Sequence, residues 1–270
     1  MQNIKLTLAY DGTDFSGWQI QPGQPTIQGA LSDVLEKLTQ QRLQIQGAGR
    51  TDAGVHAAGQ VANFKTQSEL SAGEFQRAFN ALLPPSIRVV AAEKAGPDFH
   101  ARWSAVAKTY RYRIFRGRVV PPFLWRYVQH DPFPLDFGAM AEAAREFEGE
   151  QDFTSFAAST GSEEDDRERT MTRVIYHSEM VRVTGAELYN SGEEWVYTVR
   201  GKSFLRYMVR KIVGTLIDVG RGKLRPEDMQ KLFEMRDRSK SGPTMPPQGL
   251  CLTEVEYPDV GSHSLPYADS

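Results

Sequence analysis

The chain of 270 residues has a single cysteine, Cys251. One cysteine cannot form a disulfide within the chain, and it excludes a zinc site built from several cysteines. Disulfides are rare in reducing compartments, so this composition fits the cytoplasm. We therefore expect a cytoplasmic protein.

Long apolar runs are also missing. The best candidate for a membrane span, residues 212–219, is far shorter than the roughly 20 apolar residues that a spanning helix needs. The first ten residues lack the continuous apolar stretch of a signal peptide, because Lys5 and Thr7 interrupt it. With 40% hydrophobic and 24% charged residues, the composition is that of a globular protein, and we expect no membrane contact.

A net positive charge is absent as well, since the formal net charge is −2. Taken alone, this total argues against a nucleic-acid partner, but salt screens charges beyond roughly 10 Å, so their local distribution matters more. Residues 99–130 carry seven Lys or Arg and no acid, and residues 199–225 carry eight against Asp218 alone. Residues 136–169 carry eleven acids. The sequence therefore predicts two basic segments that can bind nucleic acid.

Hydrophobic periodicity predicts strands and helices in a mixed order. Thr26 is a candidate N-cap for one helix, and Ser71 with Glu74 forms a capping box for the next. The predicted strands are residues 4–8, 43–45, 60–66, 87–91, 109–115, 173–175, 181–184, 195–200 and 250–255. The predicted helices are residues 27–38, 71–82, 136–147, 203–219 and 226–235. This order indicates an α+β fold with two halves, residues 1–105 and 106–257, and a loose tail at 258–270.

The glycine-rich residues 47–54 carry the strongest chemical signal. They do not form a dinucleotide fingerprint, because Asp52 stands where a small residue is required, and no Gly-Lys-Ser/Thr follows to make a phosphate loop. An ordinary turn is the simplest interpretation. The nearby Arg50, Thr51 and His56 favour a functional loop, since a cation beside a carboxylate lowers its pKa and keeps it ionised. An ionised Asp52 can act as a nucleophile or stabilise positive charge at a sugar carbon.

Residues 47–56, Gly-Ala-Gly-Arg-Thr-Asp-Ala-Gly-Val-His, resemble the signature of the tRNA pseudouridine synthase A family, whose aspartate is the catalytic nucleophile. Further blocks resemble the family in the same order, so the resemblance spans residues 4–257. They are Tyr-Asp-Gly at 10–12, Phe-Ser-Gly-Trp-Gln at 15–19, Asn-Ala-Leu-Leu-Pro at 80–84, Asp-Phe-His-Ala-Arg at 98–102, Lys-Thr-Tyr-Arg-Tyr at 108–112, Asp-Phe-Thr-Ser-Phe at 152–156 and Phe-Leu-Arg-Tyr-Met-Val-Arg at 204–210. One departure is Gly47, where many relatives carry cysteine.

The resemblance implies a fold and a reaction. The fold is the α+β pseudouridine synthase fold, two halves whose mixed, largely antiparallel sheets join across a basic central cleft. The reaction detaches uracil from C1′ of a uridine in tRNA, turns the base and rejoins it through C5, at positions 38, 39 and 40 of the anticodon stem-loop. It uses no cofactor and no metal. The resemblance also implies a homodimer that binds tRNA.

Roles for single residues follow from the same resemblance. Arg210 pairs with the catalytic Asp52, Arg50 replaces the flipped base in its stem, and Leu250 lines the uracil pocket. Tyr110 stacks on the extruded uracil and assists proton removal from C5. On the residues alone a core role for Tyr110 stays open, because tyrosines on strands usually pack inside the protein.

The two basic segments add predicted phosphate contacts, Arg111 and Arg206. Arg206 and Arg210 fall at four-residue spacing in the predicted helix at 203–219, beside an apolar stripe that includes Phe204. The full set of predicted substrate-binding residues is Arg50, Thr51, His56, Tyr110, Arg111, Phe204, Arg206 and Leu250. For Arg50 a role in capping loop carbonyls stays open, as does a structural hydrogen-bonding role for His56.

Two other functions compete with the enzyme hypothesis. A catalytically silent tRNA-binding protein could keep the same scaffold, although it would not need Asp52 beside so many phosphates. A nucleosidase acting on small nucleosides would not need two basic segments.

Overall fold

A computed structural model of the chain describes residues 1–158, 170–183 and 192–258. The acidic residues 159–168, the end of the predicted strand at 181–184 and nearly all of the predicted tail at 258–270 lie outside the described residues. Within the described part, no helix is both long enough and apolar enough to cross a lipid bilayer.

The strands form one continuous sheet in the order β4-β1-β3-β10-β5-β9-β8-β7, with β2 beside β3 and β6 beside β5. All pairs are antiparallel except β10 with β3 and β5 with β6, so the predicted mixed, largely antiparallel α+β architecture is confirmed. The bounds are β1 Gln2–Tyr10, β2 Gln46–Gly47, β3 His56–Thr66, β4 Ile87–Ala95, β5 Ala107–Phe115, β6 Gln129–His130, β7 Gly149–Asp152, β8 Thr172–Val183, β9 Glu194–Gly201 and β10 Leu250–Glu256.

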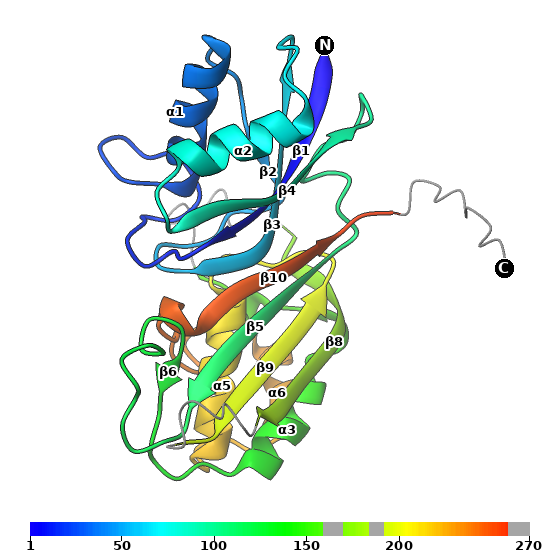
Figure 1. Cartoon of the computed structure of the whole chain (residues 1–270). Coiled ribbons are helices and arrows are strands. Elements are labelled where there is room, and N and C mark those ends of the chain that lie inside the picture. Colours follow the sequence, from blue (N-terminus) through cyan, green and yellow to red (C-terminus); the bar gives the residue numbers. More distant parts are fainter. Residues whose placement is uncertain (159–169, 184–191, 259–270) are drawn as a thin grey trace, which may run out of the picture.

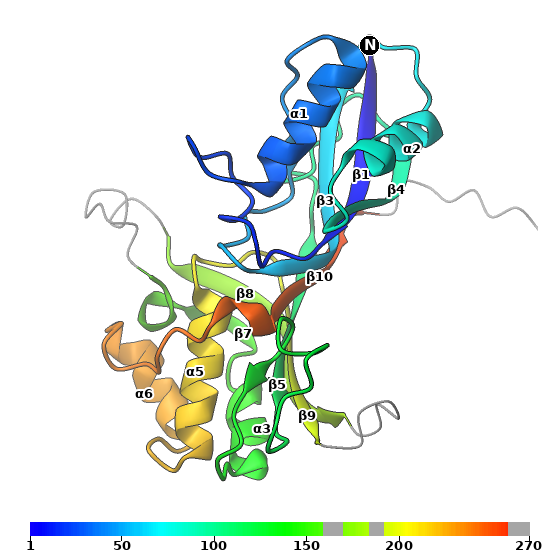
Figure 2. The same cartoon turned by 60° about the vertical axis from the view of Figure 1, so that its left-hand side comes forward.

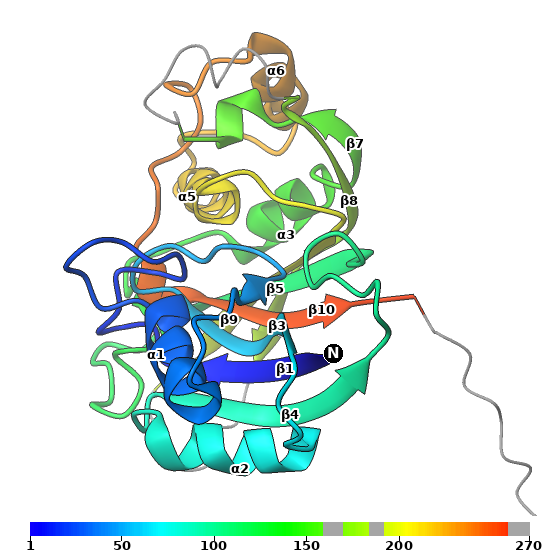
Figure 3. The same ribbon diagram turned by 90° about the horizontal axis from the view of Figure 1, so that it is seen from above.

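Helices cover the sheet in two groups. Helices α1 (Ile27–Thr39) and α2 (Ala72–Leu82) lie with β1, β3 and β4, whereas α3 (Phe137–Arg145), α5 (Met208–Gly220) and α6 (Asp228–Met235) lie with β5, β8 and β9 (Figure 2). Seen from above, α2 lies along β4 at one end of the molecule (Figure 3). The short 3-10 turns η1 (Thr154–Phe156) and η2 (Pro247–Gly249) complete the described elements.

Strand β10 joins the two groups. It comes from the end of the described chain, yet it lies between β3 and β5 in the middle of the sheet (Figure 1). Cys251 pairs with His56 of β3 on one side and with Arg111 of β5 on the other. This strand therefore brings the end of the glycine-rich loop, at the start of β3, close to the strand that carries Tyr110.

Local signals explain why most elements form where they were predicted. Thr26 accepts a hydrogen bond from the backbone N–H of Gly29, and Ser71 and Glu74 form a reciprocal capping box. In β1, Ile4, Leu6 and Leu8 are buried and alternate with more exposed residues, as a half-buried strand requires.

Four predicted elements differ from those in the structure. Residues 43–45 are not a strand, and only the two-residue β2 follows them. The strands predicted at 173–175 and 181–184 are one strand, β8, with an irregularity between Ile175 and His177. The helix predicted from residue 203 begins at Met208, because Tyr207 has a left-handed backbone with φ of 61° that no helix can continue.

Candidate active site

The loop between β2 and β3 presents Asp52, and contacts with Tyr10 and Trp18 fix its shape. Trp18 N–H donates to the carbonyl of Thr51 at 3.0 Å, and the Thr51 hydroxyl lies 2.8 Å from Tyr10 Oη. Gly54 has φ of +77°, a conformation that L side chains rarely adopt. A side chain at Gly47 would meet the Trp18 indole at about 2.5 Å, so the glycine at this departure from the family pattern makes room for that ring.

Asp52 forms an ion pair with Arg210, which lies 158 residues later in the first turn of α5. The distance from Arg210 Nη1 to Asp52 Oδ2 is 3.4 Å, and the side chains are only 13% and 26% exposed. Arg210 is held by two further contacts: its Nε donates to the carbonyl of Met245 at 2.6 Å, and its guanidinium lies 4.8 Å from the centre of the Tyr207 ring. The arginine is thus fixed before any ligand binds.

The pKa of Asp52 is raised above its ordinary value, which is opposite to the expected direction. Burial is the largest cause, and the positive charges of Arg210 and Arg206 oppose it without overcoming it. The sequence suggested Arg50 as the cation that keeps Asp52 ionised, but the charges that act on the carboxylate come from Arg210 in the first turn of α5 and Arg206 in the turn before it. That prediction was wrong because the sequence shows neighbouring charges but not burial.

Tyr110 lies in the middle of β5 and is 8% exposed. Its ring meets the Phe204 ring edge to face, with centroids 5.0 Å apart at 78°. Burial raises the pKa of the Tyr110 hydroxyl above its ordinary value, so the side chain remains a neutral phenol. No described residue makes a hydrogen bond to that hydroxyl, which leaves it available to a ligand.

Tyr112, two residues along the same strand, is part of the core. It is fully buried, and its hydroxyl donates to the carbonyl of Pro246 at 2.9 Å. Leu250 pairs with Tyr112 across β10 and β5 and is also buried. Because paired residues on neighbouring strands share a face, Leu250, Tyr110 and Tyr112 lie on the same side of the sheet.

Arg50 and His56 flank Asp52 in the sequence but differ in exposure and in their contacts within the protein. Arg50 is exposed, and in the described part of the chain its side chain has no hydrogen bond or ion pair. His56 is 5% exposed; the backbone N–H of Gly12 donates to its Nδ1, and its Nε2 lies 2.9 Å from the carbonyl of Arg126. Geometry therefore favours ligand contact for Arg50 and a structural role for His56.

The charge state of His56 follows from the same contacts. Asp11 Oδ1 lies 3.2 Å from Nδ1, a distance that would suit an ion pair with a charged imidazole. The Gly12 N–H needs Nδ1 as an acceptor, however, and burial lowers the pKa of His56 below its ordinary value. We conclude that the imidazole is neutral, with its proton on Nε2.

Arg206 and Arg111 lie on different sides of this site. Arg206 is exposed in the turn before α5 and stacks on Tyr207, with its guanidinium 4.8 Å from the ring centre. Arg206 and Arg210 therefore do not share one helix as the sequence predicted, since Arg210 belongs to α5 and Arg206 precedes it. Arg111 is exposed on the face of β5 opposite to Tyr110, so the structure does not bring it to Asp52.

Comparison with known proteins identifies the family. A family model described as tRNA pseudouridine synthase matches residues 7–104 and 143–258. The chain is 46% identical over 257 residues to tRNA pseudouridine synthase A of Solibacter usitatus (strain Ellin6076), which covers 95% of this chain and 100% of that protein. It is 42% identical over 258 residues to tRNA pseudouridine synthase A of Latilactobacillus sakei subsp. sakei (strain 23K), covering 95% and 99%. The chain belongs to the tRNA pseudouridine synthase family. The resemblance found in the sequence is thereby confirmed.

Several residues of this family member's site were missed in the sequence. Tyr10 could have been predicted, because the alternation of β1 places it on the buried face with Leu8. In the structure its hydroxyl lies next to Thr51. The carbonyl of Met245 and the left-handed Tyr207 gave no signal, since a carbonyl contact and a φ angle depend on how distant segments meet.

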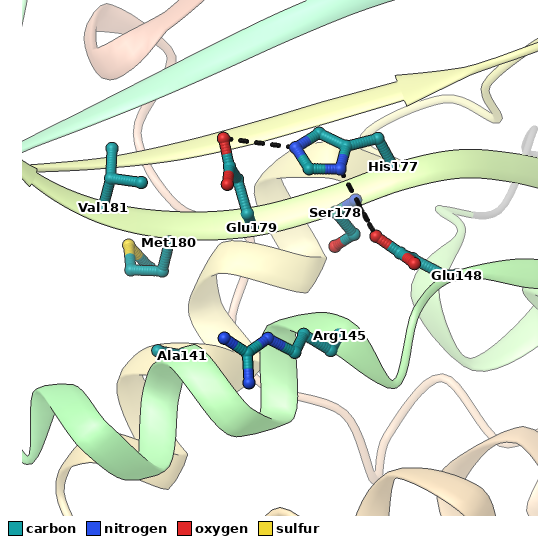
Figure 4. Close-up of a pocket in the computed structure, with 8 residues that line it drawn as sticks. All are labelled: Ala141, Arg145, Glu148, His177, Ser178, Glu179, Met180 and Val181. Atoms are coloured by element: carbon teal, nitrogen blue, oxygen red, sulfur yellow. Dashed lines mark hydrogen bonds and ion pairs between the residues drawn. The ribbon is translucent and has the colours of Figure 1, made fainter.

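A hollow elsewhere in this synthase family member lies away from the predicted site residues. It lies between α3 and β8, where His177 sits between Glu148 and Glu179 at 3.5 Å and 3.1 Å (Figure 4). Strand β8 is separated from β5 by β9, and none of the predicted site residues lines this hollow. Within residues 1–158, 170–183 and 192–258, no group of three His, Cys, Asp or Glu side chains could hold a metal ion.

Proposed function

We propose that the protein isomerises uridine to pseudouridine in tRNA, at positions 38, 39 and 40 of the anticodon stem-loop, with Asp52 as the nucleophile. The observation that carries the proposal is the ion pair between Asp52 and Arg210 in a chain of this family. Asp52 is the one carboxylate of the glycine-rich loop, and Arg210 is immobilised beside it by Met245. The named positions rest on the family resemblance.

The reaction balances within the substrate. The bond from C1′ to N1 breaks, a bond from C1′ to C5 forms, the proton leaves C5 and N1 regains one. A carboxylate nucleophile splits this rearrangement into two easier steps by holding the substrate covalently between them. For this reaction the protein has to supply only Asp52, a site with little water, and a means of holding the detached base.

Tyr110 and Phe204 supply a surface for that base. Extruding a base from a stem costs a few kcal/mol, and stacking on an aromatic ring returns roughly 1 to 3 kcal/mol. The raised pKa of Tyr110 keeps its ring a neutral phenol, which supports stacking over action as a phenolate base. We assign Leu250 to the wall of the same pocket. We assign Arg50 to the space in the RNA stem that the extruded base vacates.

Three further features belong to the proposal. We propose that the protein is a homodimer, that it works in the cytoplasm, and that residues 1–105 and 106–257 act as two halves around the site. In this arrangement Asp52 comes from the first half, and Tyr110 and Arg210 come from the second.

Tritium release tests the proposed activity. Unmodified tRNA transcript labelled with tritium at uridine C5 is incubated with the protein without added metal or cofactor, and we expect release of up to three equivalents when residues 38 to 40 are all uridine. Transcripts with cytidine at these positions serve as the control. Tight binding without release would identify a catalytically silent tRNA-binding protein instead.

The raised pKa of Asp52 predicts the acid limb of the pH profile. The nucleophile must be ionised, so kcat/KM rises with pH through the pKa of Asp52 in the free enzyme. Because that pKa is raised from 3.8, we expect the half-maximal value of the acid limb above pH 3.8. Circular dichroism at each pH separates loss of activity from acid unfolding. An acid limb at or below pH 3.8 would contradict the role of Asp52.

Arg206 and Arg111 form a matched pair for a test of RNA contact. Arg206 lies beside Arg210 at the site, so Arg206→Ala should remove one phosphate contact and reduce the slope of log Kd against log salt by about 0.7 to 0.9. The sequence predicted a phosphate contact for Arg111 too, but Arg111 lies on the opposite face of β5, so Arg111→Ala removes the same charge and should leave the slope unchanged. Fluorescence anisotropy with labelled tRNA measures both slopes; a slope for Arg206→Ala equal to that of the wild type would refute the assignment of Arg206.

A further inference from the structure

Lys108 is a cation at the catalytic loop that the reaction described above does not use. It lies on β5 two residues before Tyr110, so its side chain is on the same face of the sheet. Its Nζ lies 3.5 Å from the position that a Cβ on Gly49 would take. Lys108 therefore reaches across β10 to the loop that presents Asp52.

In the described part of the chain, this ammonium group has neither a hydrogen bond nor an ion pair. The carboxylates on the neighbouring strand do not reach it: Val255 is the β10 residue that pairs with Lys108, and Glu254 and Glu256 flank it on the other face. Glu256 is already paired with Arg200 of β9, at 2.6 Å. The charged group that acts most strongly on Lys108 is another cation, Arg102.

Arg102 is itself an exposed cation without a hydrogen bond or ion pair from its guanidinium to any described residue. Its guanidinium lies 4.5 Å from the ring centre of Trp103, which holds it in place. Burial, together with the charge of Arg102, lowers the pKa of Lys108 from 10.5 to about 8. A half-buried lysine beside a like charge destabilises the folded protein unless an anion binds there.

We propose that Lys108 and Arg102 form a binding site for one backbone phosphate of the substrate RNA, next to the nucleotide that enters the Asp52 site. The inference rests on the proposed function and deepens it. A phosphate between the two cations removes their repulsion and supplies the acceptor that the Lys108 ammonium lacks. Through Gly49, the same phosphate lies close to the loop of Asp52, so it would fix the position of the nucleotide relative to the nucleophile.

The test uses Lys108→Met, Lys108→Arg and the control Lys65→Met, which removes an exposed lysine from β3. Binding of labelled tRNA transcript is measured against KCl concentration, with Asp52→Asn present in every protein to prevent turnover. For Lys108→Met at pH 7 we expect about tenfold weaker binding and a salt slope reduced by about 0.7 to 0.9. Lys65→Met should keep the slope of the parent protein. Thermal unfolding of Lys108→Met should show an equal or higher Tm, because a half-buried charge without an ion-pair partner among the described residues is removed.

Raising the pH provides a second measurement on folded proteins. At pH 9 most Lys108 is neutral, so the parent protein should lose the same part of its salt slope, whereas Lys108→Arg should keep it because arginine stays charged. An unchanged slope in Lys108→Met, or equal losses in the parent and Lys108→Arg between pH 7 and pH 9, would overturn the phosphate site. Tritium release by the wild type on the same transcript tells this failure apart from failure of the proposed function, which would abolish release itself.

Discussion

Asp52→Asn is expected to abolish tritium release, with kcat lowered by at least about 10³-fold, because the amide cannot act as the nucleophile. Binding of tRNA should stay within about threefold of the wild type or become tighter, since the substitution removes a negative charge facing a polyanion. Single-turnover release and anisotropy with the same labelled transcript measure the two quantities separately.

The stability of Asp52→Asn distinguishes this loss from unfolding. The pKa of Asp52 is raised in the folded protein, so folding is less favourable with an ionised Asp52 than with a neutral one. A neutral amide should therefore leave Tm equal or higher. Asp33→Asn, at an exposed position of α1, is the matched control and should keep full activity. Substantial release by Asp52→Asn would remove Asp52 as the nucleophile.

Elements with local causes could be predicted from the sequence. The capping box of Ser71 and Glu74 lies within four residues, and the structure shows both of its bonds, at 2.8 Å and 3.3 Å. The alternation of Ile4, Leu6 and Leu8 likewise depends only on the strand period. Such signals are complete in a short window, so the strands and helices that carry them begin close to where the sequence places them.

The start of α5 could not be predicted in the same way. Apolar spacing continues back to Phe204, but Tyr207 adopts a left-handed conformation that costs an L residue roughly 1 to 2 kcal/mol. Distant contacts hold the turn, including the bond from the Ala158 N–H to the carbonyl of Arg206. The left-handed conformation places the Tyr207 ring against the Arg210 guanidinium. The helix that the apolar spacing predicts is therefore interrupted at the residue that positions this arginine.

For the candidate site too, some features could be predicted from local sequence and others could not. The family motifs identified Asp52, Tyr110 and Arg210, and the structure brings all three to one region. The motifs could not give the burial that raises the pKa of Asp52, or the approach of Lys108 to Gly49. Both depend on β10 bringing β3 and β5 together, and the position of a strand in a sheet is not encoded in a short window.

Arg210 should act on the reaction mainly through the charge it places beside Asp52. Removing that charge in Arg210→Met leaves burial opposed only by the more distant Arg206, so the pKa of Asp52 should rise further. We expect the acid limb of kcat/KM to move to higher pH and kcat near pH 7 to fall about 100-fold, a cost typical of removing one electrostatic group from an active site.

Arg210→Lys separates charge from position. A lysine keeps the positive charge, so the acid limb should stay close to that of the wild type. It has a single donor group in place of a planar fork, so it cannot bind the carbonyl of Met245 and Asp52 in the same way, and kcat should fall about tenfold at every pH. A purely structural arginine would instead lower Tm in both variants and leave the acid limb in place. An acid limb that does not move in Arg210→Met would therefore show that this arginine does not tune the nucleophile.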